Sequence, residues 1–151
     1  MIKINLGSGN RPMQGYENID IQERVNPDLV CDVAMGLPYG DNSVDEVRAF
    51  DFLEHIERDD VINVITEIWR VLKPGGIFES FTPDAEFGQG AFQDFTHRSF
   101  WTENSWLYFS DELHRNLYGV EANFKIEKLE RMKSDGRVYH LYVQATKREV
   151  A

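Results

Sequence analysis

Short apolar runs separated by polar or glycine-rich interruptions cover most of the chain, and this pattern predicts strands joined by crossovers. Five runs in the first 82 residues are short and rich in β-branched residues, as strands are. We expect strands at residues 2–6, 16–21, 27–33, 44–50 and 76–82. Residues 124–132 and 137–147 alternate apolar with polar positions around Asp135-Gly136, a dipeptide typical of an antiparallel hairpin.

Apolar residues that recur every three or four positions predict a helix at residues 58–72, followed by the helix-ending sequence KPGG. Residues 83–98 show no period and are expected to form a long loop, which in compact domains often has a function. Two shorter helical segments are expected after Thr102 and after Ser110. Strands, crossovers and a terminal hairpin together predict one α/β domain over residues 1–151.

Charge and composition exclude several classes of protein. The net charge of −10 argues against a surface that binds nucleic acid or an anionic membrane. The single cysteine, Cys31, cannot form an internal disulfide, and with no recognisable signal peptide this predicts a cytoplasmic protein. The four histidines are scattered and no His/Cys pair has ligand spacing, so we expect no metal site.

Three polar or glycine-rich features follow three of the predicted strands. In a parallel sheet, ligands bind beyond the carboxyl ends of the strands, where the strand order reverses. Gly7 and Gly9 allow a tight turn and close approach of a ligand to the backbone. Asp20 could accept hydrogen bonds from both hydroxyls of a ribose, and Asp32 from an exocyclic adenine amine. A glycine loop alone is often an ordinary turn, but the combination indicates a site for a nucleoside-containing ligand.

The segments LGSGN, NID, CDVAMGLPYGDNSVDEV, DFLEHI and RVLKPGGIF resemble, in this order, the motif series of class I S-adenosylmethionine-dependent methyltransferases. The resemblance implies a Rossmann-like sandwich with a mostly parallel seven-stranded sheet and an antiparallel C-terminal hairpin. It implies S-adenosylmethionine as cofactor, held by Leu6, Gly7, Ser8 and Gly9 along methionine and ribose, Asp20 at the ribose hydroxyls, Ile21, Cys31, Asp32 and Val33 around adenine, and Phe50 and Asp51 at the methionine moiety.

The sequence also departs from the family pattern. Asn10 stands where a third small residue is usual, and only about ten residues separate the first two strands, fewer than the dozen or more of a helical crossover. We therefore expect a turn or a single helical turn there. The helices that usually precede the first strand are not present in the sequence, so we expect a pocket open on that side, which a second copy in a homodimer could close.

Methyl transfer requires few dedicated catalytic groups, because the protein mainly positions donor and acceptor. His55, after the fourth strand, and His97, in the long loop, are candidates for acid–base catalysis or substrate contact. The alternatives are a structural histidine at a helix start for His55 and a surface histidine for His97. Asp84, after the fifth strand, either contacts substrate or forms an Asx turn. His140 is interpreted as structural.

The predicted function is transfer of a methyl group from S-adenosylmethionine to a small-molecule acceptor. The segment DFTHRSFWT, which resembles part of small-molecule methyltransferases, favours that acceptor class. The alternative is a non-catalytic cofactor-binding or scaffolding module on the same fold. An NAD-dependent reductase is disfavoured because Asp20 comes eleven residues after Gly9, whereas that fingerprint expects roughly twenty.

Overall fold

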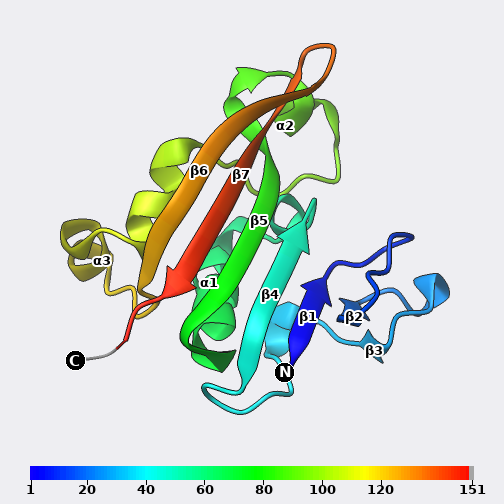
Figure 1. Ribbon diagram of the computed structural model, residues 1–151. Coiled ribbons are helices and arrows are strands. Elements are labelled where there is room, and N and C mark those ends of the chain that lie inside the picture. Colours follow the sequence, from blue (N-terminus) through cyan, green and yellow to red (C-terminus); the bar gives the residue numbers. More distant parts are fainter. Residues whose placement is uncertain (150–151) are drawn as a thin grey trace.

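A seven-stranded mixed sheet, in the order β3-β2-β1-β4-β5-β7-β6, forms the framework of residues 1–149, which the computed structural model describes (Figure 1). Strands β1 to β5 are parallel, and β7 is antiparallel to both β5 and β6. This confirms the predicted Rossmann-like sheet with its C-terminal hairpin. The strands are β1 (Lys3–Leu6), β2 (Glu17–Asp20), β3 (Leu29–Val30), β4 (Val44–Phe50), β5 (Leu72–Gly88), β6 (Phe124–Asp135) and β7 (Val138–Lys147).

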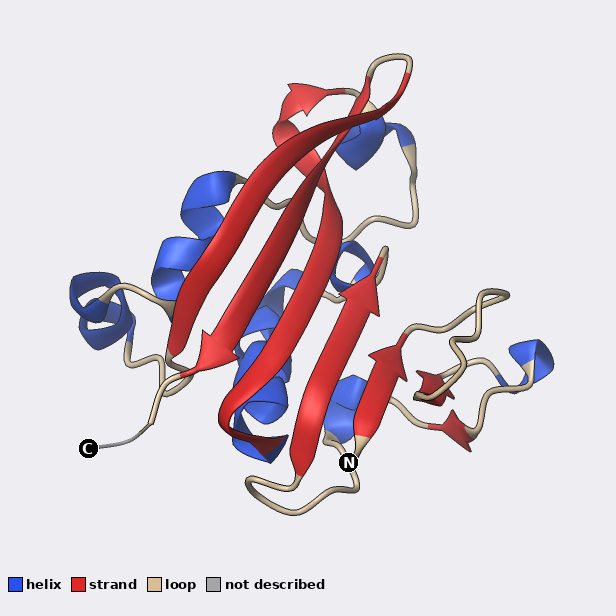
Figure 2. Ribbon diagram, viewed as in Figure 1, coloured by secondary structure: helices blue, strands red, loops and turns tan. Residues whose placement is uncertain are grey.

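The helices lie at different places against the sheet: in the view of Figure 2, the longest lies behind the central strands and the others lie near the top and at the left edge. They are α1 (Val61–Val71), α2 (Gly90–Gln93) and α3 (Glu112–Tyr118), with 3-10 turns η1 (Glu23–Val25), η2 (Val33–Met35), η3 (Leu53–His55), η4 (Arg58–Asp60) and η5 (Glu103–Phe109). The apolar stripe of α1 packs on the sheet through Ile65 and Ile68, and Trp106 of η5 packs on Phe78 of β5. None of the helices within residues 1–149 has the length and apolar character that a bilayer crossing requires.

The fifth strand begins earlier than the sequence predicted. The predicted helix 58–72 consists of η4 and α1 and ends at Val71, because Leu72 pairs with Val44 of β4. The KPGG segment is an irregularity inside β5, since pairing with β4 resumes at Ile77. Gly75 accepts the positive φ of 77° that this detour needs.

The prediction of a long loop at residues 83–98 is wrong for residues 83–88. Strand β5 continues to Gly88, because β7 pairs with it as far as Val138. The N–H group of Gln89 then donates to the carbonyl of Arg137 at 2.9 Å, and the short helix α2 follows. Between β1 and β2 the chain forms turns without a helix, as the short spacing predicted.

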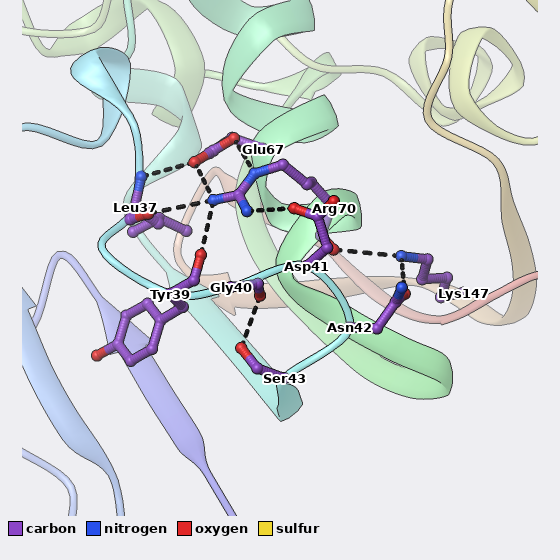
Figure 3. A network of polar contacts seen from close by, with 9 residues as sticks. All are labelled: Leu37, Tyr39, Gly40, Asp41, Asn42, Ser43, Glu67, Arg70 and Lys147. Carbon is purple, nitrogen blue, oxygen red and sulfur yellow. Dashed lines mark hydrogen bonds and ion pairs between the residues drawn. The ribbon is translucent and has the colours of Figure 1, made fainter.

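Arg70, near the end of α1, holds the loop that leads into β4 (Figure 3). Its guanidinium donates to both Glu67 carboxylate oxygens at 2.7 and 2.8 Å, to Asp41 at 2.6 Å and to the Tyr39 carbonyl at 2.9 Å. Glu67 in turn accepts from the Leu37 N–H at 2.7 Å, and these hydrogen bonds keep the pKa of Glu67 below its usual value. The network fixes the start of β4, whose other end lies at the candidate site.

Candidate functional site

The strand order reverses between β1 and β4, and a groove lies beyond the carboxyl ends of these strands. The groove has a volume of about 550 Å³. It is called the cofactor groove here, and most of the predicted cofactor residues line it: Gly7, Gly9, Asp20, Ile21, Cys31, Asp32, Val33 and Asp51. Four segments that are separate in the sequence therefore meet at the edge of the sheet where a ligand was expected.

The remaining predicted cofactor residues lie beside this groove. Ser8 and Phe50 line an adjoining cavity of about 630 Å³, which shares Gly7, Gly9 and Asp51 with the groove. Leu6 differs, because its side chain is fully buried in the core and lines neither cavity. The site is reached by the residues that follow Leu6, from Gly7 to Gly9.

Asp20 is held in place by two backbone donors. Its Oδ2 accepts from the Gly9 N–H at 2.9 Å and its Oδ1 from the Gln22 N–H at 2.9 Å. The carboxylate therefore ties the glycine loop to the end of β2. A carboxylate has about four acceptor positions, so both oxygens can still accept from a ligand's hydroxyl groups. Asp32 is exposed and caps η2 by accepting from the Ala34 N–H at 3.0 Å.

Gly7 and Gly9 both have positive φ, of 67° and 49°, but only Gly7 is sterically confined. A Cβ atom at Gly7 would lie 2.5 Å from Cδ1 of Phe52, whereas one at Gly9 would meet open space. We expect Gly9→Ala to cost about 1–2 kcal/mol of stability through its left-handed backbone. Gly7→Ala should cost roughly 1–3 kcal/mol more, because Phe52 must move.

Thermal unfolding of the two glycine variants tests this expectation. Equal losses of stability in Gly7→Ala and Gly9→Ala would show that contact with Phe52 does not constrain the loop.

Asp51 follows β4 with a φ of 52°, which is uncommon for a residue with a side chain. Its N–H group donates to the Phe81 carbonyl at 2.8 Å, and its Oδ1 lies 3.2 Å from Nε2 of His140. Backbone strain of this kind is concentrated at functional sites. Asp51 lies between the cofactor groove and a third cavity.

This third cavity, of about 240 Å³, adjoins the groove and shares Asp51 and His55 with it. We call it the acceptor-side cavity. Glu54, Asp94, His97 and His140 also line it. The rings of His55 and His97, which the sequence singled out separately, pack edge to face with centroids 5.0 Å apart. The prediction missed His140 as a site residue, because no sequence pattern relates β7 to the turn after β4.

Glu54 is the most unusual residue of the acceptor-side cavity. It is only 2% exposed, and its Oε1 has no hydrogen-bond partner within residues 1–149. Burial raises the pKa of Glu54 to about 8, and the negative charges of Asp51 and Asp94 raise it further. A buried carboxyl group without a partner is costly and marks a candidate functional position.

Asp84 does not line any of these cavities. Its fully buried side chain accepts from the Glu86 N–H at 2.9 Å and pairs with Arg131 Nε at 2.5 Å. The Asx-type turn is therefore the correct interpretation of Asp84, and substrate contact is not.

The part of the sequence that forms this site overlaps a match to a known protein family. Residues 12–79 match the family described as "Methyltransferase domain". No curated protein matches the chain.

Solved structures share the fold at low sequence identity. An S-adenosylmethionine-dependent methyltransferase from Methanosarcina mazei is 18% identical, with a TM-score of 0.67 over 97% of this chain and 92% of that one. The putative methyltransferase in a complex with the Haloferax volcanii Trm112 activator is 16% identical, with a TM-score of 0.69 over 98% and 83%. The (4+2)-cyclase SpnF is 17% identical, with a TM-score of 0.68 over 97% and 74%. At these identities the likeness shows the fold, and the cyclase shows that the fold alone does not select a reaction.

Proposed function

We propose that this chain is a class I S-adenosylmethionine-dependent methyltransferase, which transfers the methyl group of that cofactor to a small-molecule acceptor. The observation that carries the proposal is the convergence of the glycine loop, Asp20, Asp32 and Asp51 on one groove where the strand order reverses. When bound, the cofactor supplies a methyl group on a sulfonium, and the protein positions it.

The chain's own residues would orient the cofactor within the groove. Asp20 accepts from the ribose hydroxyls while its backbone donors hold it in place. Ile21, whose side chain is 60% exposed, offers an apolar surface to adenine, and Asp32 accepts from the adenine amine. Phe50 and Asp51 direct the methionine end toward the acceptor-side cavity, with which Asp51 is shared.

The acceptor would enter the acceptor-side cavity. A volume of about 240 Å³ is below that of typical ligand pockets and suits one end of a small molecule. His55 and His97 contact the acceptor there. The acidic charge of the whole chain opposes a nucleic acid in this role.

Calorimetric titration of S-adenosylhomocysteine tests the cofactor assignment, with NADH in parallel. We expect micromolar binding of the adenosyl compound and a loss on the order of 1.5–3 kcal/mol in Asp20→Ala, or roughly 10–150-fold in Kd. Asp59→Ala removes an exposed carboxylate outside the groove and is the matched control. Unchanged affinity in Asp20→Ala would refute the assigned site, and preferential binding of NADH would favour a reductase.

The non-catalytic alternative makes a different prediction. A scaffolding module on this fold would bind S-adenosylhomocysteine with the same dependence on Asp20. It would transfer no radiolabelled methyl group to any fraction of a metabolite extract, whereas the proposed enzyme labels at least one.

We further infer that the protein is cytoplasmic and forms a homodimer. A single free cysteine, Cys31, suits the reducing cytoplasm. Sedimentation velocity would distinguish a homodimer from a monomer.

A further inference from the structure

We propose that Glu54, His55 and His97 bind a divalent transition-metal ion beside the cofactor groove. One ligand atom from each residue lies within 4.8 Å of the others. The sequence predicted no metal site, because His97 comes 42 positions after His55 and no spacing links them. Binding of the ion is argued from these residues alone, whereas its chemical role rests on the proposed function.

The two histidines present the nitrogen atoms that a metal needs. His97 Nδ1 lies 2.8 Å from the Ala91 carbonyl oxygen, and His55 Nδ1 lies 3.3 Å from the Thr96 carbonyl oxygen. Because a carbonyl only accepts, a hydrogen bond to it places the proton on Nδ1 and leaves the lone pair on Nε2. Nε2 of His97 also lies 3.5 Å from Asp94 Oδ2, which adds a negative charge beside the proposed site. Metal-binding histidines commonly donate their second nitrogen to a backbone carbonyl in this way.

Glu54 supplies the carboxylate. Glu54 lines the acceptor-side cavity, and its Oε1 has no hydrogen-bond partner in residues 1–149, although the residue is 2% exposed. Three carboxyl groups and three imidazoles line this cavity, and no Lys or Arg of the described chain does so. A bound cation would supply the missing positive charge and the missing partner for Oε1.

Backbone hydrogen bonds hold the three ligands in a fixed arrangement. The N–H groups of Arg98 and Ser99 donate to the Glu54 carbonyl at 2.7 and 3.1 Å. The Ser99 hydroxyl donates to the Leu53 carbonyl at 2.8 Å and accepts from the Trp101 indole N–H at 3.0 Å. The loop that carries His97 is thus joined to the turn that carries Glu54 and His55, as a preorganised site requires.

Two imidazoles and one carboxylate form a donor set typical of zinc and non-haem iron. Three protein ligands leave coordination positions open toward the acceptor-side cavity, where oxygen atoms of an acceptor would bind. The acceptor class is therefore a compound with a hydroxyl group, since a bound divalent ion makes a hydroxyl easier to deprotonate. The acceptor oxygen bonds to the methyl carbon, the carbon–sulfur bond breaks with its electron pair kept by sulfur, and the hydroxyl proton passes to water.

Titration with Co²⁺, followed by visible absorption and calorimetry, tests the site. We expect one ion per chain in the wild-type protein. His97→Gln and Glu54→Gln should weaken binding at least about 100-fold, because loss of a mere second-shell partner already costs roughly 10–100-fold. His114→Gln, which alters a histidine paired with Asp111 at α3, is the matched control and should bind as the wild type does.

A second measurement on the unmodified protein does not depend on how the variants fold. In ¹⁵N spectra of the imidazoles, Zn²⁺ should shift the Nε2 signals of His55 and His97 and leave those of His114 unchanged. Absence of stoichiometric Co²⁺ binding, or Zn²⁺ shifts confined to His114, would overturn the proposal. S-adenosylhomocysteine titrated into the same sample separates the two proposals, since binding of that compound without Co²⁺ refutes only the metal site.

Discussion

Replacing Trp106 by alanine should lower the free energy of unfolding by roughly 3–5 kcal/mol, the range for truncation of a buried aromatic side chain. Trp106 is 1% exposed, and its ring packs on Phe78, Trp101 and Phe109 with centroid distances of 5.9, 5.3 and 6.1 Å. The neighbouring rings belong to the sheet and to its helical cover, so they cannot collapse freely into the space. For a chain of this size the melting temperature should fall by about 6–20 °C.

Trp106→Phe is the matched control for this prediction. It keeps an aromatic ring and removes the indole N–H, which is buried without a partner in residues 1–149. We therefore expect a loss well below that of Trp106→Ala. Thermal unfolding followed by circular dichroism measures both, and equal losses would mean that aromatic packing is not the source of the stability.

Arg131→Met should destabilise the protein more than loss of an exposed ion pair does, because it leaves a buried carboxylate without its ionic partner. Asp84 is 0% exposed and pairs with Arg131 Nε at 2.5 Å. After the substitution, the Glu86 N–H would be the one donor within residues 1–149 that still reaches this carboxylate. The variant also loses the guanidinium that lies 3.9 Å over the ring of Phe87. Urea unfolding monitored by fluorescence measures the change.

Two further variants isolate the buried charge. The double variant Asp84→Asn/Arg131→Met removes the charge together with its partner and should recover part of the loss. Lys128→Met changes another cation of β6, whose exposed pair with Glu130 contributes no more than about 1 kcal/mol. If Arg131→Met costs no more than Lys128→Met, the interaction with Asp84 does not stabilise the protein.

The sheet and the cofactor groove could be predicted from the sequence because their signals are local. Gly7 and Asp51 come directly after β1 and β4, and Asp20 is the last residue of β2. Parallel strands bring their carboxyl ends to one edge of the sheet. Burial of the Leu6 side chain could not be predicted, because a motif does not distinguish a backbone position from a buried side chain.

The acceptor side could not be predicted in the same way. Glu54, His97 and His140 come from a turn, a loop and a distant strand, and only tertiary structure brings them together. The extension of β5 to Gly88 could not be predicted for the same reason, because its partner strand β7 lies some fifty residues later in the chain. Local patterns do not report such pairings.

Backbone hydrogen bonds hold both ends of residues 90–96, which bears on how the specificity for an acceptor could change. The segment is attached to the hairpin through Gln89 and to the turn after β4 through Arg98 and Ser99. Between these two fixed points, the exposed positions Phe92 and Phe95 can change while the sheet and the cofactor groove keep their shape. Gly90 and Thr96 must stay, because a Cβ atom at Gly90 would lie 2.7 Å from Val138 and Thr96 lines the groove. Under the proposed function, a combinatorial library confined to these exposed positions would sample different acceptors without altering the groove that holds the cofactor.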